Sequence, residues 1–280
     1  MDLAGLAKAS GLRRVGARPP LGKYLAETWE RRDFIYTMAK FRVRASLEES
    51  RLGVLWLLLR PCLDAAIYGA IFGVLQGPAA GTDFTARVVV GIFFFQFFTK
   101  SLGDGAKAIT GNRALVQSLA FPRLTLPLAK VVEQALSTLP SIVLLIVILP
   151  ALGHWPNLSW LMTIPLFVLY TLFNAGISMI AARLTVYIAD LTQLLPYLSR
   201  ILLYTSGVLF NVDTIFANHS WVRTLYDFNP LYQVIQLARG ALMGIDYNPA
   251  YWLYLSIWSV AFFLVGLLFF WVAEERYGRE

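Results

Sequence analysis

One segment of this chain, Ala250–Val272, contains no charged residue and is long enough to cross a membrane as a helix. The hydrocarbon core of a bilayer is about 30 Å thick, and a helix needs roughly 20 residues to cross it. The whole chain has the same bias, because 58% of its residues are hydrophobic and only 15% are charged. This composition lies outside the range of an ordinary soluble domain. The sequence therefore predicts an integral membrane protein.

Six segments are apolar enough and long enough to span a bilayer, which predicts an all-α integral membrane fold with six transmembrane helices. They are Leu52–Leu75, Thr85–Leu102, Leu126–Leu149, Leu161–Ala182, Leu194–Phe210 and Ala250–Val272. The second and the fifth are the shortest of the set.

The Lys and Arg residues predict which side of the membrane each loop occupies, since cytoplasmic loops carry an excess of both. The region before the first span is rich in them, and the loop between the second and third spans adds Lys107, Arg113 and Arg123. The loops Gln76–Phe84 and Pro150–Trp160 contain neither residue. Both termini are therefore expected in the cytoplasm, in a protein of the cytoplasmic (inner) membrane. The same placement explains the net charge of +7 without any binding of nucleic acid.

A basic amphipathic helix is expected just before the first span. Within Arg31–Leu47 the apolar residues at helical spacing are Phe34, Met38, Phe41 and Ala45, and the basic residues on other faces are Arg32, Lys40 and Arg44. Such a helix lies at the cytoplasmic interface, where it anchors to anionic lipid or docks a partner. The predicted organisation is a cytoplasmic tail over 1–30, this interface helix over 31–51, the transmembrane domain over 52–272 and a cytoplasmic tail over 273–280.

A long outer segment separates the fifth and sixth spans. Val212–Met243 is too aromatic for a solvated loop, and it is interrupted at Asn229-Pro230. We therefore expect two short helices, partly re-entrant and packed against the outer ends of the spans.

The sequence carries no constellation typical of a membrane enzyme. Its two histidines, His154 and His219, fall in outer loops, and neither accompanies a cysteine or carboxylate cluster at metal-ligand spacing. No serine in a span has a histidine in another span to activate it, and no paired aspartates are spaced to hold a diphosphate through magnesium. The glycines of a phosphate-binding loop are also missing. We predict no catalytic, metal or cofactor site, so any ATP must be bound by another chain.

Ionisable residues within the spans are energetically costly and are therefore candidate functional residues. Arg60 and Asp64 lie one helical turn apart in the first span, where they could form an internal ion pair or face a wet cavity. Arg183 and Asp190 lie at the cytoplasmic end of the fourth span. For this second pair, anchoring at the membrane boundary is the alternative to a functional role.

Aromatic side chains within the spans could line a path for a sugar chain. The flat C–H faces of sugars stack on aromatic rings, which hold a glycan without strong hydrogen bonds. The candidates are Tyr68, Phe72, Tyr197, Tyr204 and Phe210, of which Tyr197 and Tyr204 are seven residues apart and share a helix face. The expected role of the Phe cluster, comprising Phe93, Phe94, Phe95, Phe97 and Phe98, is lipid-facing packing.

A set of short motifs is distributed along the whole chain. The basic helix is followed by Leu52-Gly53, Trp56, Pro61, Tyr68 and Phe72-Gly73; then come Gly91, the Phe cluster, Asn112, Leu115-Val116, Phe121-Pro122-Arg123 and Pro127-Leu128; the last are Arg183, Asp190, Asn229-Pro230-Leu231 and Arg239. In this order and spacing the motifs resemble those of the permease subunits of ABC-type polysaccharide exporters. The resemblance covers nearly the whole chain, from about Tyr24 to Trp271.

The resemblance implies a transport subunit, not an enzyme. Two copies of such a permease would bind two cytoplasmic ABC ATPase subunits, which bind the ATP, and would form a continuous tunnel between the copies. The family's substrates are lipid-linked O-antigen, teichoic acid or cell-wall galactan. The aromatic candidates named above would line that tunnel, and membrane lipids would surround the dimer.

The resemblance also implies which residues contact the ATPase. The helix from Phe34 to Leu47 would be an interface helix, Asp104–Ser118 would supply a coupling helix, and Val212–Met243 would correspond to outer gate helices. The residues implied at the ATPase contact are Phe34, Met38, Phe41, Asp104, Asn112 and Arg113.

Two other functions stay open from the sequence. An ABC exporter of drugs or lipids would share the fold but would have a wide hydrophobic cavity in place of an aromatic, water-accessible tunnel. A polyprenyl-processing membrane enzyme would turn over its substrate without an ATPase.

Overall fold

The computed structural model describes residues 19–48, 53, 55–76, 81–119 and 121–275. The predicted tail over 1–30 lies outside the described residues up to residue 18, as do Leu52 and the end of the chain at 276–280. The regular elements of the described part are all helices, with no strand among them. This confirms the predicted all-α class.

The elements follow one another along the chain with short connections. They are α2 (Leu21–Glu30), α3 (Arg32–Glu48), α4 (Leu55–Gln76), α5 (Gly81–Ala106), η2 (Thr110–Asn112), α6 (Arg113–Ser118), α7 (Thr125–Ala151), η3 (Leu158–Met162), α8 (Thr163–Tyr187), α9 (Leu191–Thr205), α10 (Val212–Ile215), α11 (Ser220–Asp227), α12 (Pro230–Met243) and α13 (Ala250–Val272). The two η elements are single turns of 3-10 helix.

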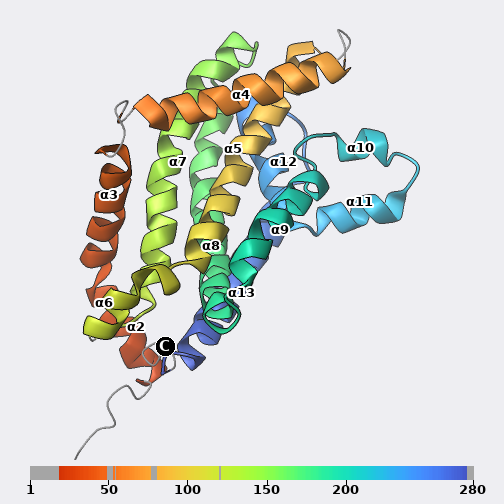
Figure 1. The fold of residues 1–280 in the computed structure, drawn as a ribbon. Helices are drawn as coiled ribbons and strands as arrows, with labels where there is room; N and C mark the ends of the chain where they lie inside the picture. Colours follow the sequence, from red (N-terminus) through yellow and green to blue (C-terminus); the bar gives the residue numbers. More distant parts are fainter. Residues whose placement is uncertain (1–18, 49–52, 54, 77–80, 120, 276–280) are drawn as a thin grey trace, which may run out of the picture.

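Four long helices, α5, α7, α8 and α13, form the body of the molecule (Figure 1). α3 stands upright along the outside of α7, so it does not lie across the end of the bundle as an interfacial helix would. α2, α6 and the C-terminus gather at one end, which we call the basic end because Lys107, Arg113 and Arg123 flank the spans there. α10 and α11 project sideways from the bundle, away from this end.

The body helices are also those that, within the described residues, are long and apolar enough to cross a membrane. The four segments are Asp83–Ala106, Thr125–Ala151, Leu158–Tyr187 and Ala250–Val272. They match the second, third, fourth and sixth predicted spans. The chain is therefore a multi-pass membrane protein.

The first and fifth predicted spans differ from the expectation. α4 is helical from Leu55 to Gln76, but Figure 1 shows it crossing the bundle at a steep angle to α5 and α7. α9 has only 15 residues, which gives it a length of about 22 Å. The chain leaves this helix at Ser206 and turns at Gly207, whose φ of +70° is a left-handed conformation that favours glycine. The predicted count of six spans is therefore not confirmed.

The Phe cluster of α5 is buried, so the expectation that it faces lipid is wrong. Its five rings are at most 5% exposed. α5 is the central helix of the fold and contacts α4, α7, α8, α9 and α12. The rings of Phe97 and Tyr170 meet edge to face with their centroids 5.4 Å apart. Such a pair contributes about 0.5–1.5 kcal/mol beyond the area that it buries.

α8 and α13 approach each other closely at two glycines. A Cβ atom at Gly176 would overlap the backbone of Phe262, and one at Gly266 would overlap the carbonyl of Gly176. Small residues allow the backbones of two membrane helices to come into direct contact. The crossing of α8 and α13 therefore depends on both glycines.

The outer segment contains three helices instead of the expected two, and its break at Asn229-Pro230 is present. α12 begins at Pro230, and the side chain of Asn229 caps it by accepting a hydrogen bond from the Leu231 N–H at 3.0 Å. Most residues of α12 are buried, whereas α11 has no buried residue. α12 is thus a part of the core rather than a peripheral loop helix.

Candidate functional site

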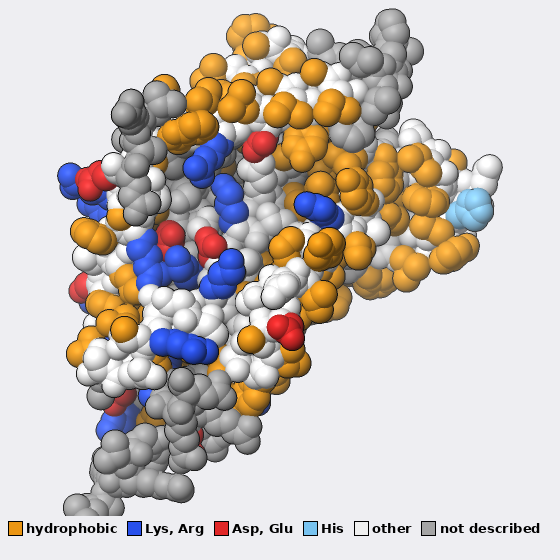
Figure 2. Space-filling model, viewed as in Figure 1, with side chains coloured by type: hydrophobic (Ala, Val, Ile, Leu, Met, Phe, Trp, Pro, Cys, Tyr) orange, Lys and Arg blue, Asp and Glu red, His pale blue; other side chains and the backbone are white. Residues whose placement is uncertain are grey.

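A polar pocket near the basic end joins α3 to α5 and α7. Its volume is about 440 Å³, and it is lined by Arg42, Ala45, Ser46, Asp104, Lys107, Gly111, Asn112, Lys130 and Glu133. Figure 2 shows basic and acidic side chains gathered on one face of the molecule. The pocket brings together two residues expected at the ATPase contact, Asp104 and Asn112, with four further charged side chains.

Arg42 connects α3 to its neighbours through this pocket. Its guanidinium donates a hydrogen bond to the side-chain oxygen of Asn112 at 2.7 Å and lies 3.7 Å from the carboxylate of Glu133. Lys130 donates to the same carboxylate at 2.9 Å. A charge cluster in a partly buried site is stronger than an exposed ion pair. Movement of α3 would therefore be passed to the turn at Asn112 and to α7.

The other residues expected at the ATPase contact have different surroundings. Phe41 is 70% exposed and Phe34 is 40% exposed, whereas Met38 is partly buried in a small apolar cluster at the basic end. Arg113 is exposed at the first position of α6. Phe41 and Arg113 are thus available to a partner protein.

The face of α3 that packs on α7 is not the stripe expected from the sequence. Ile35 and Ala39 are its buried residues. Arg42 lies on the same face of the helix, about one turn after Ala39. The exposed stripe includes Phe41. α3 therefore turns an apolar side chain outward while its polar Arg42 is held inside the molecule.

A row of polar side chains extends from the pocket along α5. Gln96, Lys100 and Asp104 are spaced by four residues and so share one face of the helix. Asp104 accepts a hydrogen bond from Gln134 of α7 at 2.6 Å. Gln96 donates a hydrogen bond to Asp64 of α4, also at 2.6 Å. These contacts give the carboxylates of Asp64 and Asp104 one neutral hydrogen-bond donor each.

Arg60 and Asp64 do not form the ion pair that their spacing suggested. Asp64 is bonded to Gln96, and the guanidinium of Arg60 lies over the ring of Trp56, 5.5 Å from its centroid. Asp64 is therefore bonded to the polar row of α5, whereas Arg60 contacts an aromatic ring of its own helix, α4.

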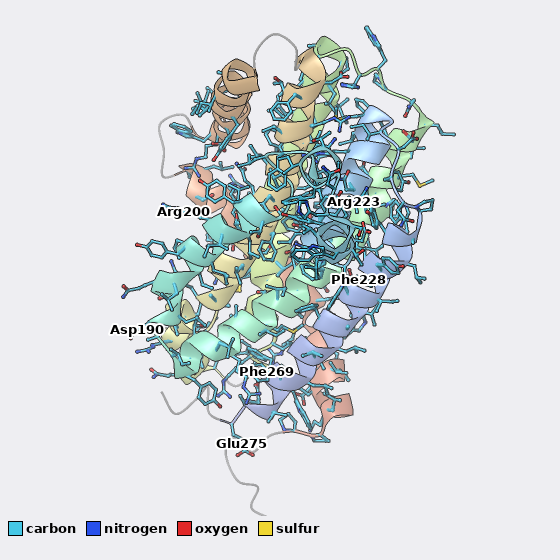
Figure 3. The ribbon with its side chains drawn as sticks, turned by 90° about the vertical axis from the view of Figure 1, so that its right-hand side faces the viewer. Asp190, Arg200, Arg223, Phe228, Phe269 and Glu275 are labelled. Carbon is cyan, nitrogen blue, oxygen red and sulfur yellow. The ribbon has the colours of Figure 1, made fainter. Side chains whose placement is uncertain are left out.

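Arg183 and Asp190 are also separate from each other. The guanidinium of Arg183 donates to the carbonyl of Phe269 and lies 3.8 Å from the centroid of that ring. Asp190 is exposed in the turn before α9 (Figure 3). Arg183 thus connects α8 to α13.

A hydrogen-bond cluster at the basic end was not foreseen from the sequence. The hydroxyl of Tyr24 donates to the Glu274 carboxylate at 2.6 Å, and the backbone N–H of Arg123 donates to it at 3.1 Å. The Arg123 guanidinium donates to the backbone carbonyl of Glu274 at 2.7 Å. Burial raises the pKa of Glu274, and the bonds from Tyr24 and Arg123 oppose that shift. Tyr24 and Glu274 are 250 positions apart, so no local pattern could have revealed the cluster.

The two tunnel candidates on α9 point away from the rest of the chain. Tyr197 is 64% exposed and Tyr204 is 61% exposed, and Leu194 and Ile201 are exposed beside them. Figure 3 shows the side chains of α9 projecting from the molecule. We call this surface the α9 face and define it by these four residues; the guanidinium of Arg200, also on α9, lies 5.9 Å from the centroid of the Tyr197 ring.

The remaining tunnel candidates lie elsewhere. Tyr68 of α4 packs, partly buried, against the main core, and the side chain of Phe72 lies outside what the structure describes. Phe210 is half-buried and meets Phe216 and Tyr226 edge to face, with ring centroids 6.4 and 6.3 Å apart. The candidates whose side chains the structure describes, Tyr68, Tyr197, Tyr204 and Phe210, are therefore not gathered into one lining within a single copy.

Arg239 of α12 is buried and holds three backbone segments together. Its guanidinium donates to the carbonyls of Arg87 and Gly207 at 3.1 Å and to that of Val208 at 2.7 Å. Burial lowers the pKa of Arg239 to about 10, and the nearby charge of Arg87 adds to the shift. The side chain is therefore still charged at neutral pH. Arg239 fixes α12 to the first turns of α5 and to the turn that follows α9.

Within the described residues, no group of three or more His, Cys, Asp or Glu side chains could hold a metal ion. The polar sites of this part of the chain are instead built from Arg and Lys with carboxylates and backbone carbonyls.

The model of the ABC-2 type transporter family matches residues 34–243. An O-antigen export system permease protein RfbA of Klebsiella pneumoniae is 28% identical over 248 residues, which cover 88% of this chain and 94% of that protein. A protein of the same name from Myxococcus xanthus is 29% identical over 170 residues, or 60% of this chain and 64% of that protein. Because the family model covers most of the chain, the chain belongs to the ABC-2 type transporter family.

Proposed function

We propose that this chain is the permease subunit of an ATP-driven exporter that moves a lipid-linked polysaccharide across the bacterial cytoplasmic membrane. The family membership and the similarity to O-antigen export permeases support this cargo class. It includes lipid-linked O-antigen, teichoic acid and galactan. The observation that carries the proposal is the α9 face, because it leaves aromatic side chains uncovered in a chain that buries its main Phe cluster.

A second copy of the chain is the proposed neighbour of the α9 face. A tyrosine hydroxyl within a bilayer requires a polar partner or water, which lipid tails do not offer. Tyr197 and Tyr204 would find both if the α9 faces of two copies lined a water-accessible path. A glycan would then pass along rings that stack on sugars without trapping them.

The energy for export would come from two cytoplasmic ABC ATPase subunits, which bind and hydrolyse the ATP. With both termini in the cytoplasm, the basic end faces these subunits. Closure of the ATPases would push on Phe41 of α3 and on the turn and helix at 104–118. The Arg42 contacts with Asn112 and Glu133 would pass the movement to α7, and the bundle would move as a rigid body to open the path between the two copies.

Placing a charge at Tyr204 is expected to block export. A Tyr204→Asp variant should lose most polysaccharide export, since a carboxylate in the path is strongly solvated and repels the anionic lipid carrier. Export is measured as surface polysaccharide in cells that lack the native permease. The tagged permease should still co-purify with the ATPase encoded beside it, and the complex should still hydrolyse ATP in nanodiscs.

The control for this variant is Tyr204→Phe, which keeps the ring and should export at close to the wild-type level. Normal export by Tyr204→Asp would show that the path does not pass Tyr204. Failure of the wild-type permease to bind any ATPase would remove the transporter proposal itself.

Cross-linking is expected to show that two copies meet at the α9 face. In a Cys62→Ser background, which removes the single native cysteine, Tyr197→Cys should give a covalent dimer with a short bis-maleimide in membranes. Val147→Cys on α7 is the matched control, because Val147 is 66% exposed but lies on a different helix. Equal dimer yields from the two variants would contradict the proposed seam.

A further inference from the structure

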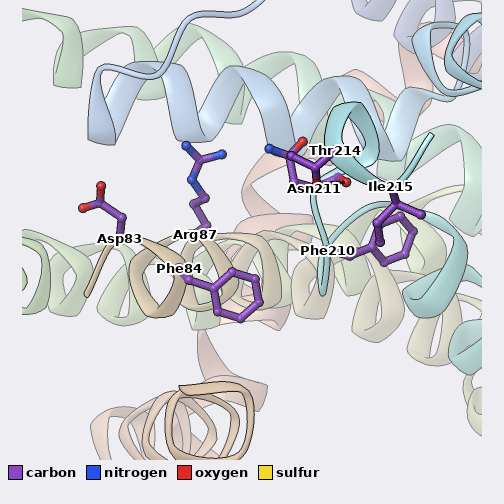
Figure 4. Close-up of a pocket in the computed structure, with 7 residues that line it drawn as sticks. All are labelled: Asp83, Phe84, Arg87, Phe210, Asn211, Thr214 and Ile215. Atoms are coloured by element: carbon purple, nitrogen blue, oxygen red, sulfur yellow. Dashed lines mark hydrogen bonds between the residues drawn. The ribbon is translucent and has the colours of Figure 1, made fainter. Parts of the chain in front are cut away.

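A second pocket lies at the end of α5 opposite the basic end (Figure 4). Its volume is about 420 Å³, within the roughly 300–1,000 Å³ range of small-molecule sites. Asp83, Phe84 and Arg87 come from the first turns of α5, and Phe210, Asn211 and Thr214 come from the segment after α9. The chain therefore leads from the last residue of the α9 face, Tyr204, through a short turn to the pocket residue Phe210.

The apolar part of the pocket consists of two aromatic rings, Phe84 and Phe210, and the side chain of Ile215. Phe210 is held in place by its edge-to-face contacts with Phe216 and Tyr226. Phe84 is partly buried against the main core. A fixed, half-exposed ring presents a flat face on which the C–H side of a sugar ring can stack.

The polar part of the pocket offers both donors and acceptors. The guanidinium of Arg87 has no hydrogen bond or ion pair with any residue that the structure describes, although its backbone carbonyl accepts the bond from Arg239. The hydroxyl of Thr214 donates to the carbonyl of Asn211 at 3.0 Å, which leaves its oxygen free to accept. The Asp83 carboxylate lies 3.3 Å from the His154 ring and is otherwise open to solvent.

The balance of charge decides which ligand suits these groups. A phosphate would be repelled by Asp83, and a cation would be repelled by Arg87. A purely apolar ligand would leave the Arg87 guanidinium without a partner. A neutral polyol satisfies all of them, because each hydroxyl can donate to Asp83 and accept from Arg87.

We propose that this pocket binds a neutral sugar unit of the exported glycan as it leaves the path between the two copies. The proposal rests on the proposed function and extends it by naming a sugar subsite at the exit. Stacking on Phe210 would orient the sugar, and Arg87, Asn211 and Thr214 would read its hydroxyl groups. The subsite would hold the emerging chain and hinder its return.

Sugar binding to the purified full-length permease in nanodiscs tests the proposal. The probes are methyl glycosides of galactose, glucose, mannose and rhamnose, with the methyl glycoside of glucuronic acid and inorganic phosphate as charged comparators. Binding is measured by saturation-transfer NMR. At least one neutral glycoside should bind, and Arg87→Gln and Phe210→Leu should each weaken it about tenfold, as expected for loss of a charged donor or a stacked ring.

A pair of threonines supplies the matched control. Thr214→Val should weaken binding by about threefold, the loss expected for one neutral hydrogen bond. Thr224→Val on α11 should leave it unchanged, because Thr224 is equally exposed but lies outside the pocket and bonds only to the Ser220 carbonyl.

Three results would overturn the sugar subsite. They are the absence of binding by every neutral glycoside, tighter binding of glucuronide or phosphate, and equal binding by wild type and the pocket variants. The proposed function is judged separately by ATPase co-purification and export. A permease that exports polysaccharide but shows any of the three results would refute only the subsite.

Discussion

Replacing Gly176 with alanine is expected to separate α8 from α13 and to destabilise the transmembrane bundle. The added Cβ would overlap the backbone of Phe262, which cannot rotate away as a side chain could. Overpacking of a well-packed contact costs about 1–3 kcal/mol, and more when the backbone must shift. Thermal unfolding of the purified permease in detergent should show a Tm lower by roughly 5–10 °C.

Gly103 provides the matched control for this substitution. It also lies in a membrane helix, but a Cβ there would meet nothing within 4 Å. Gly103→Ala should leave the Tm unchanged or raise it slightly, since alanine is better than glycine in a helix by about 0.5–1 kcal/mol. Gly266→Ala should act like Gly176→Ala, and the double variant should lose less than the sum, because one separation of the helices relieves both clashes. A wild-type Tm for Gly176→Ala would contradict the close crossing.

Replacing Arg239 with methionine is expected to have a comparable or larger effect. Methionine fills a similar length without donors, so the carbonyls of Arg87, Gly207 and Val208 would lose their bonds. A buried carbonyl without a partner costs about 1–3 kcal/mol, which applies to Gly207 and Val208 in the turn after α9, whereas the Arg87 carbonyl keeps its backbone bond within α5. The Tm should fall by roughly 10 °C or more, and the turn at 206–211 should become accessible to protease.

A lysine variant separates the geometry of Arg239 from its charge, and a second variant, at an exposed arginine, is the control. Arg239→Lys keeps the charge but replaces the planar guanidinium with a single ammonium group. Its Tm should therefore lie between those of the methionine variant and the wild type. Arg31→Met removes an exposed arginine and should leave the Tm unchanged. A methionine variant with wild-type stability would mean that Arg239 does not clamp α12 to α5 and to the turn after α9.

The Arg239 clamp also bears on export. It fixes the turn that leads from the α9 face to Phe210, and hence to the pocket at the far end of α5. Loss of the clamp should therefore weaken sugar binding at that pocket even in protein that remains folded.

Much of the secondary structure could be predicted from the sequence. Long apolar segments must be helical in a bilayer, because no water is present to satisfy their backbone. This reasoning located α5, α7, α8 and α13 to within a few residues. The break at Asn229-Pro230 was also predictable, since proline lacks the N–H that continues a helix and asparagine can cap one.

The directions of helices and the partners of charged residues were not predictable. The apolar sequence of α4 predicted a span, yet the helix crosses the bundle, because its direction depends on the surfaces of α5 and α7. The spacing of Arg60 and Asp64 suggested a local pair, but Gln96 from another helix bonds to Asp64. The Phe cluster was expected to face lipid and is buried, because hydrophobicity alone does not distinguish a protein neighbour from a lipid tail.

The sequence by itself determined that this chain is a helical membrane protein with basic flanks, since both properties follow from transfer of residues between water and lipid. Only the tertiary structure decided that Arg239 meets three carbonyls, that Tyr24 meets Glu274 and that Asp83 and Arg87 share a pocket with Phe210. Those contacts join residues far apart in the chain. Their energies depend on the positions of whole helices, which no local pattern of residues specifies.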